Sequence, residues 1–196
     1  MKQVLMIEMM SAQQKRIHPY KFNMWLGLAG IIMMFAGLTS AYIVKRSQPG
    51  WESFTLPGIF SYSTLVILVS SVAIQVALRA FKAHQMGKYR LFLAITAVLG
   101  ILFSILQVSG FYRFEEMGMK MIGIGSNPAY SFVLAIAGLH IVHVLGGVVA
   151  LGIVFFKAFS TKKRNYDSTP VEIVATYWHF VDILWVYIFV FFHLLH

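Results

Sequence analysis

Five stretches of mostly apolar residues, each long enough to cross a bilayer, occupy most of this chain. They run over residues 22–44, 58–78, 91–112, 129–156 and 171–195. A spanning helix needs roughly 20 such residues, and in lipid only helices and closed barrels satisfy every backbone polar group. The sequence therefore predicts an all-α integral membrane bundle of five transmembrane helices. This single membrane domain covers residues 22–196 and follows a tail over residues 1–21.

The composition agrees with membrane insertion and excludes several classes of protein. Hydrophobic residues make up 59% of the 196 residues and charged residues only 12%, about half the charged share of a typical soluble domain. The chain has no cysteine, which excludes disulfides, thiolate metal sites and iron–sulfur clusters. The net charge of +9 does not indicate a nucleic-acid partner here, because the basic residues follow the membrane topology.

The lysines and arginines divide unevenly between the two predicted membrane faces. With five spans, the tail, the second loop and the fourth loop share one face and carry twelve of the sixteen basic residues. The other face carries Lys45, Arg46, Arg113 and Lys120. Because short cytoplasmic segments are enriched in Lys and Arg, we predict a cytoplasmic N-terminus and an external C-terminus.

Ionisable side chains inside the spans are the unusual feature of the sequence. At about 100° per residue, Glu172, His179 and Asp182 fall within one quadrant of the fifth span. We predict that this polar stripe faces protein and that the opposite side of the helix meets lipid. That opposite side carries Tyr177, Leu184, Ile188 and Phe192.

Asp182 is the hardest of these residues to place, since it lies near the middle of its span. An unpaired charge at that depth costs roughly 2.5–3.5 kcal/mol on insertion scales, so Asp182 is expected to be neutral or paired. The fourth span runs antiparallel to the fifth, which puts His143 at a similar depth and His140 one turn away. We expect a structural hydrogen bond between Asp182 and one of these histidines. A proton-handling role and a ligand or lipid contact are the alternatives.

Histidines on two spans together with Asp182 have the composition of a metal site. A di-iron bundle, however, takes about four glutamates and two histidines, and the centre of these spans offers one acidic residue. We therefore expect no metal and no haem in this chain.

Three further polar residues have a predicted role. Gln75 and Gln107 are expected to form hydrogen bonds between helices. Lys157 lies fourteen residues after His143 on nearly the same helical face, at the predicted cytoplasmic edge. A lysine there suits the headgroup of an anionic lipid, so His143 and Lys157 are the lipid-binding candidates. Simple extension of Lys157 to the membrane interface is the alternative.

Three segments of the chain resemble subunit III of the haem-copper respiratory oxidases. Residues 175–189 read ATYWHFVDILWVYIF and resemble the last-helix motif of that family, YWHFVD followed by Trp. Residues 137–147 read AGLHIVHVLGG and resemble TGFHGxHVxxG, with His140 and His143 at its two histidines. Residues 24–38 read MWLGLAGIIMMFAGL and resemble MWLFLxSExMFFAGL. The likeness runs through all five spans in order, as in the shorter five-helix bacterial members.

Single positions both follow and depart from the pattern of this family. Glu172 stands where the family has a glutamate before its last motif, and Lys157 matches a basic position at the end of the preceding helix. Gly30 and Ile31 replace a serine and an intramembrane glutamate, and Gly110 replaces a second glutamate. Any role of those two carboxylates is therefore absent from this chain or has moved.

The resemblance implies a helical bundle without haem, copper or catalytic residues of its own, because the redox centres lie in partner subunits. It implies packing on subunit I, in a complex that also contains subunit II, and binding of phospholipids between helices. The expected role is to support proton uptake and lasting turnover of a proton-pumping cytochrome c oxidase in a bacterial inner membrane. A larger respiratory supercomplex is a further partner that this context allows.

Other functions remain open at this point. Within the family, the chain could serve a quinol oxidase or act as the accessory protein of nitric oxide reductase. From another class, it could be a small transporter with a His–Asp proton relay, although it lacks inverted repeats and paired Gly/Pro-broken helices. A membrane enzyme with its own metal is the third class.

Overall fold

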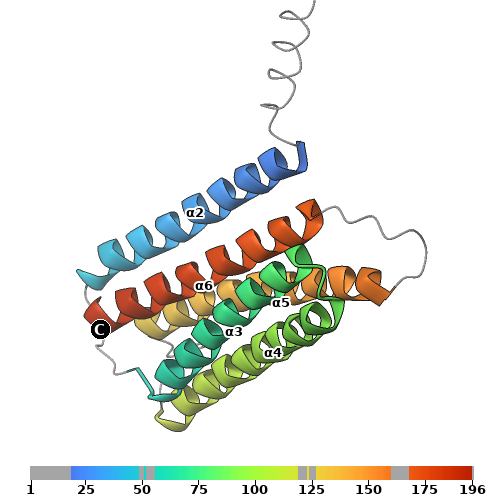
Figure 1. Ribbon diagram of the computed structural model, residues 1–196. Helices are drawn as coiled ribbons and strands as arrows, with labels where there is room; N and C mark the ends of the chain where they lie inside the picture. The colour runs from blue at the N-terminus through green and yellow to red at the C-terminus, as the bar shows by residue number, and fades with distance from the viewer. Residues whose placement is uncertain are drawn as a thin grey trace, which may run out of the picture.

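The computed structural model describes residues 19–48, 51, 56–118, 123, 127–159 and 168–195. In this part of the chain five long helices occur, each apolar and long enough to cross a membrane (Figure 1). They confirm the all-α prediction and agree with five spans. The predicted tail lies outside the described residues as far as residue 18. The helices are α2 (Pro19–Arg46), α3 (Ile59–Lys82), α4 (Met86–Glu116), α5 (Pro128–Phe159) and α6 (Thr169–Leu195).

The helices extend past the apolar stretches from which they were predicted. The basic loop expected after the second span is only a turn over residues 83–85, because Arg79 and Lys82 belong to α3 and Lys88 belongs to α4. In this turn His84 has a φ angle of 56°, the left-handed conformation that ends many helices. The length of an apolar stretch matches the thickness of the hydrocarbon core, whereas the helix continues into the polar interface. Hydropathy therefore underestimates the length of each helix.

Four of the helices form a ring, and α2 packs on the outside of it. Helix α3 contacts α4 and α6, and α5 contacts the same two helices. The four therefore follow one another around a four-helix bundle in chain order, as short connections between antiparallel neighbours require. Helix α2 contacts only α5 and α6 (Figure 1). Helix α6 thus has neighbours on three sides.

The side chain of Trp178 fills the centre of this ring. It is 1% exposed, and its indole lies between Gly100 of α4 and Gly147 of α5. A Cβ atom at Gly100 would lie 2.5 Å from the ring, and one at Gly147 would lie 2.9 Å from it. The indole Nε1 donates to Ser70 Oγ of α3 at 3.0 Å. One side chain of α6 therefore contacts all three other helices of the bundle.

A second tryptophan repeats this arrangement two helical turns further along α6. Trp185 Nε1 donates to Thr64 Oγ1 of α3 at 2.9 Å, and its ring meets Phe103 of α4 edge to face at 5.1 Å. The seven-residue interval between the tryptophans is the repeat of left-handed helix packing. The seam between α3 and α6 therefore combines large rings with hydroxyl groups.

The prediction that one side of α6 meets lipid is wrong for most of that side. Leu184 is 7% exposed and Ile188 is 0% exposed, and Tyr177 is half-buried. Helices α5 and α2 both contact α6, and on this side Tyr177 donates to the His143 carbonyl of α5 while the Phe192 ring lies 5.5 Å from Tyr42 of α2. The outward strip of α6 is narrower and carries Ile183 and Leu194.

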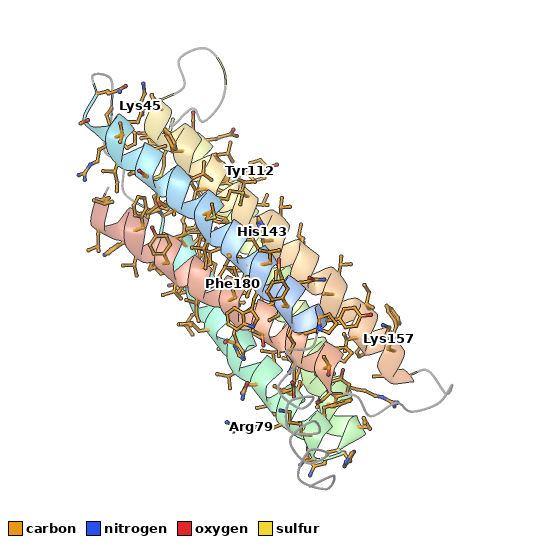
Figure 2. All side chains as sticks on the ribbon, turned by 90° about the horizontal axis from the view of Figure 1, so that it is seen from above. Lys45, Arg79, Tyr112, His143, Lys157 and Phe180 are labelled. Carbon is orange, nitrogen blue, oxygen red and sulfur yellow. The ribbon has the colours of Figure 1, made fainter. Side chains whose placement is uncertain are left out.

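The basic residues that the structure describes separate between the two ends of the bundle. Arg79 and Lys157 lie toward one end, and Lys45 lies toward the other (Figure 2). Since helix direction alternates along the chain, Lys21, Lys82 and Lys88 join the first end. The membrane orientation itself remains a prediction.

Gly147→Ala should destabilise the bundle, because the added methyl group would lie 2.9–3.0 Å from the Trp178 ring. Overpacking of this kind costs about 1–3 kcal/mol. Gly146→Ala is the matched control, since the nearest atom there is the Tyr177 hydroxyl at 3.9 Å. Thermal unfolding in detergent should give a lower midpoint for Gly147→Ala only. Equal midpoints for the two variants would contradict this packing.

The orientation can be tested with reporter fusions at His196. A reporter that works only outside the cytoplasm should be active there, because five spans put the two termini on opposite sides. The same reporter fused after Gln85, between α3 and α4, should be silent and serves as the control. An active cytoplasmic reporter at His196 would refute the predicted number of spans.

Candidate functional site

The first residue of the polar stripe, Glu172, ties three helices together at the basic end of the bundle. Its Oε2 accepts from Lys21 Nζ of α2 at 2.9 Å, and its Oε1 accepts from Lys82 Nζ of α3 at 2.9 Å. Ser168 Oγ also donates to Oε1 at 3.1 Å. Single exposed ion pairs contribute little, but this carboxylate sits in the first turn of α6, where a negative charge is favoured. Glu172 thus links α6 to α2 and α3 by ion pairs.

His179 lies two turns deeper and forms hydrogen bonds with two side chains of α3. Its Nε2 lies 3.2 Å from Gln75 Oε1, and its Nδ1 lies 2.7 Å from Ser71 Oγ. The amide oxygen can only accept, so Nε2 carries the proton. In a neutral imidazole Nδ1 then accepts, and Ser71 donates. The helix-to-helix hydrogen bond predicted for Gln75 is confirmed.

Asp182 is 2% exposed, and neither of its carboxyl oxygens has a hydrogen-bond partner among the described residues. The predicted pairing with His140 or His143 is therefore wrong, since no hydrogen bond or ion pair joins the carboxyl group to either ring. The antiparallel arrangement of α5 and α6 predicts the depth of these residues in the membrane. It does not predict the direction in which their side chains point.

His140 lies in an aromatic enclosure. It is fully buried, and its ring centroid lies 5.2 Å from Trp185, 5.7 Å from Phe103 and 6.4 Å from Phe35. Neither ring nitrogen has a hydrogen-bond partner in the described part of the chain. The aromatic rings of α2, α4 and α6 thus hold this imidazole in place by packing.

His143, the second histidine of α5, is bonded within its own helix. Its Nδ1 donates to the Leu139 carbonyl at 2.7 Å, and its ring meets Phe35 edge to face at 5.8 Å. Lys157 is exposed near the end of α5, roughly 21 Å further along the helix at 1.5 Å per residue. The structure therefore does not bring these two lipid-binding candidates to one headgroup (Figure 2).

Sequence reasoning missed the hydroxyl groups of α3. Ser63 Oγ accepts from Gln107 Nε2 of α4 at 2.8 Å, which confirms the bond between helices predicted for Gln107. Ser63 and Ser70 are seven residues apart, as are Thr64 and Ser71. This repeat of small hydroxyl residues in an apolar helix was the available signal.

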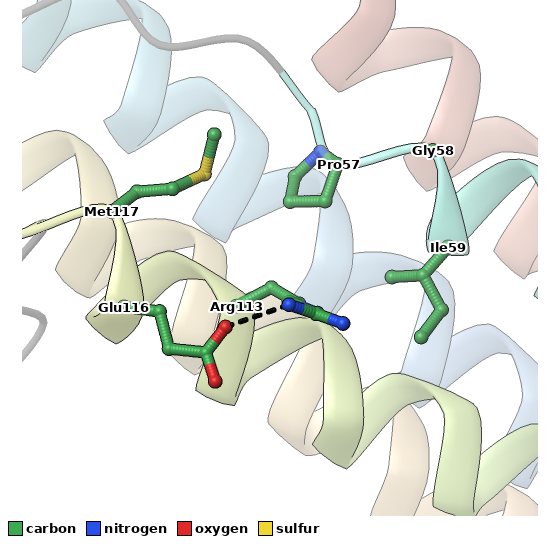
Figure 3. Close-up of a pocket in the computed structure, with 6 residues that line it drawn as sticks. All are labelled: Pro57, Gly58, Ile59, Arg113, Glu116 and Met117. Carbon is green, nitrogen blue, oxygen red and sulfur yellow. Dashed lines mark hydrogen bonds and ion pairs between the residues drawn. The ribbon is translucent and has the colours of Figure 1, made fainter.

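One hollow, drawn in Figure 3, lies where α3 begins and α4 ends, at the opposite end of the bundle from Glu172. It contains the ion pair between Arg113 Nη1 and Glu116 Oε2, at 2.9 Å. Both charges are exposed and bonded to each other, and none of the predicted site residues reaches this place. The residues that line it are Pro57, Gly58, Ile59, Arg113, Glu116 and Met117.

The predicted site residues do not converge on a metal centre. In the described ranges no three His, Asp or Glu side chains come together in a way that could hold an ion. His179 bonds to side chains of α3, whereas the two histidines of α5 lie against aromatic rings. The predicted residues are thus spread over separate places in the bundle.

Comparison with known proteins covers nearly the whole chain. Residues 21–195 match the cytochrome c oxidase subunit III family. Cytochrome c oxidase subunit 3 of Bacillus subtilis is 28% identical over 171 residues, 84% of this chain and 81% of that protein. The probable cytochrome c oxidase subunit 3 of Mycobacterium leprae is 29% identical over 167 residues, with 83% and 81% covered.

A relative named for a different electron donor matches equally far along the chain. Cytochrome bo(3) ubiquinol oxidase subunit 3 of Buchnera aphidicola is 25% identical over 178 residues, 88% of this chain and 85% of that protein. The resemblance inferred from the three motifs is thus confirmed over all five helices. The chain belongs to the cytochrome c oxidase subunit III family and is a multi-pass membrane subunit of a respiratory oxidase.

Proposed function

We propose that this chain is the accessory, non-redox subunit of a proton-pumping haem-copper terminal oxidase that takes electrons from cytochrome c. The observation that carries this proposal is the family match over residues 21–195. The chain packs on subunit I, in a complex that also contains subunit II, within a bacterial inner membrane. Haem and copper belong to those partner subunits.

The fate of the polar groups supports an accessory role. The polar atoms of three side chains of α6 form ion pairs or hydrogen bonds with neighbouring helices. These side chains are Glu172, Trp178 and His179. Reduction of oxygen needs groups that hold redox centres, whereas these side chains hold one helix to the next. Their arrangement suits a subunit that stabilises its partners.

The outer face of α2 supports contact with a partner subunit. Met33 is 74% exposed, and a Cβ atom at Gly30 or Gly37 would meet nothing within 4 Å. Small residues let helices approach closely in lipid, where packing takes over from the hydrophobic effect. This face suits the apolar helices of subunit I.

Lipid binding and support of proton uptake complete the proposal. Lys157 is exposed at the basic end of α5, where a lysine attracts anionic phospholipid headgroups. Ile31 stands in place of the glutamate of the family and cannot carry a proton. No proton path of this subunit therefore runs through residue 31. The effect of the subunit on turnover of the oxidase is then indirect.

A quinol oxidase is the second candidate function. The observation that favours it is the similarity to the ubiquinol oxidase subunit 3 of Buchnera aphidicola. The electron donor is selected by other subunits. This chain would therefore have the same accessory role in a cytochrome c oxidase and in a quinol oxidase. Oxygen consumption by the whole complex with reduced cytochrome c, and separately with a quinol, decides between them.

Removal of this subunit should leave the initial rate of oxygen reduction largely unchanged. Activity should then decline faster over many turnovers, and proton uptake should be lower, because the stabilising bundle is missing. The measurement is oxygen consumption by the complex with and without the chain, followed to inactivation. Adding back the purified chain is the control and should restore the lifetime of the enzyme.

Haem spectra of the depleted complex must accompany this assay. Immediate and complete loss of oxygen reduction, with intact haem spectra, would show that the chain has a catalytic role. An unchanged lifetime and unchanged proton uptake would show that it supports neither.

A further inference from the structure

Helix α2 is held on the ring of the other four helices by one side only. It contacts α5 and α6, and its buried residues lie on one stripe, at intervals of seven, four and three residues. These residues are Leu28, Phe35, Thr39 and Tyr42. In lipid, a helix with such a narrow contact is kept in place by close packing and polar bonds. The interactions at its two ends therefore decide how firmly it is attached.

The end of α2 near Tyr42 is attached by uncharged groups. Tyr42 is fully buried, and its ring centroid lies 5.2 Å from Phe191 and 5.5 Å from Phe192 of α6. One turn earlier, Thr39 Oγ1 lies 3.1 Å from the Tyr187 hydroxyl of α6. Packing of rings and a bond between two hydroxyls involve no formal charge, so dissolved salt does not screen them.

The opposite end of α2 is attached by charges. Lys21 Nζ of α2 and Lys82 Nζ of α3 lie 2.9 Å from the two carboxylate oxygens of Glu172, and the lysines are 40% and 54% exposed. Among the described helices, α2 does not contact α3. The single carboxylate therefore holds two ammonium groups from separate helices close together. Exposed charges of this kind are screened by salt, unlike the rings at the other end.

We propose that α2 is a strap, anchored at Tyr42 and closed at its other end by an ionic clasp in which Glu172 holds Lys21. Lys82 bonds to the second carboxylate oxygen and fixes the direction of Glu172. Ions that screen the clasp release the Lys21 end of α2, whereas the aromatic anchor stays closed. The contact between α2 and α6 then opens from the basic end of the bundle. This device depends on this chain's own residues and not on which oxidase the chain serves.

Distances between spin labels on the full chain, in nanodiscs of zwitterionic lipid, test the strap. The chain has no cysteine, so introduced cysteines are labelled specifically for double electron–electron resonance. One pair replaces the exposed residues Asn23 and Gln85 at the basic end, and a second pair replaces the exposed residues Val44 and Tyr112 at the other end. Lys21→Gln should lengthen and broaden the first distance and leave the second unchanged.

Two matched variants and a salt series separate the clasp from a general effect of charge. Glu116→Gln removes an exposed carboxylate that is bonded to Arg113 at the other end, and it should change neither distance. Lys82→Gln should leave α2 closed, because Lys21 keeps its bond to Glu172. Raising the salt from roughly 0.1 M to roughly 1 M shortens the range of charge interactions from about 10 Å to about 3 Å. The wild-type first distance should then approach that of Lys21→Gln.

Three results would overturn the strap. An unchanged first distance in Lys21→Gln would show that the clasp does not hold α2. A wild-type first distance that is the same at both salt concentrations would show that ions do not release it. A second distance that lengthens together with the first would show that Tyr42 is not an anchor. Circular dichroism confirms that each variant keeps its helices.

Discussion

The bundle depends on the fit of the Trp178 indole between two glycines on different helices. The ring can reach the centre because Gly100 and Gly147 have no Cβ, and a Cβ at either position would come within 3 Å of it. In lipid the hydrophobic effect does not drive helices together, so close packing and hydrogen bonds must do so. Trp178 supplies both, since its ring fills the space and its Nε1 bonds to Ser70.

Polar side chains then decide which helices are neighbours. Along the seam between α3 and α6, Trp185 bonds to Thr64 and His179 bonds to Ser71 and Gln75. Each bond joins an aromatic or imidazole nitrogen of α6 to a small polar group of α3. A shift of one residue along either helix would break every one of these bonds. The repeat therefore fixes the register of the two helices as well as their contact.

Sequence reasoning succeeded where a property belongs to one helix and failed where it depends on neighbours. Hydropathy is a property of a single segment, so the five helices were predictable. The bonds of Gln75 and Gln107 were also predictable, because a lone amide in lipid needs a partner. The absence of a bond between Asp182 and the histidines of α5 was not predictable, since depth says nothing about the direction in which a side chain points. Burial of Leu184 and Ile188 depends on the positions of α2 and α5, which periodicity does not encode.

The two positions at which this chain replaces a glutamate of its family are filled by packing contacts. Gly110, where the resemblance implies a carboxylate, lies so close to the Phe60 ring that a Cβ atom would approach it to 2.7 Å. An acid at this position would require the seam between α3 and α4 to open. Ile31 is apolar and packs against the core. Among the residues that the structure describes, Asp182 is then the fully buried acid of the bundle. The two positions at which the family carries glutamates are therefore packing positions in this chain, and its buried acid stands on a different helix from either of them.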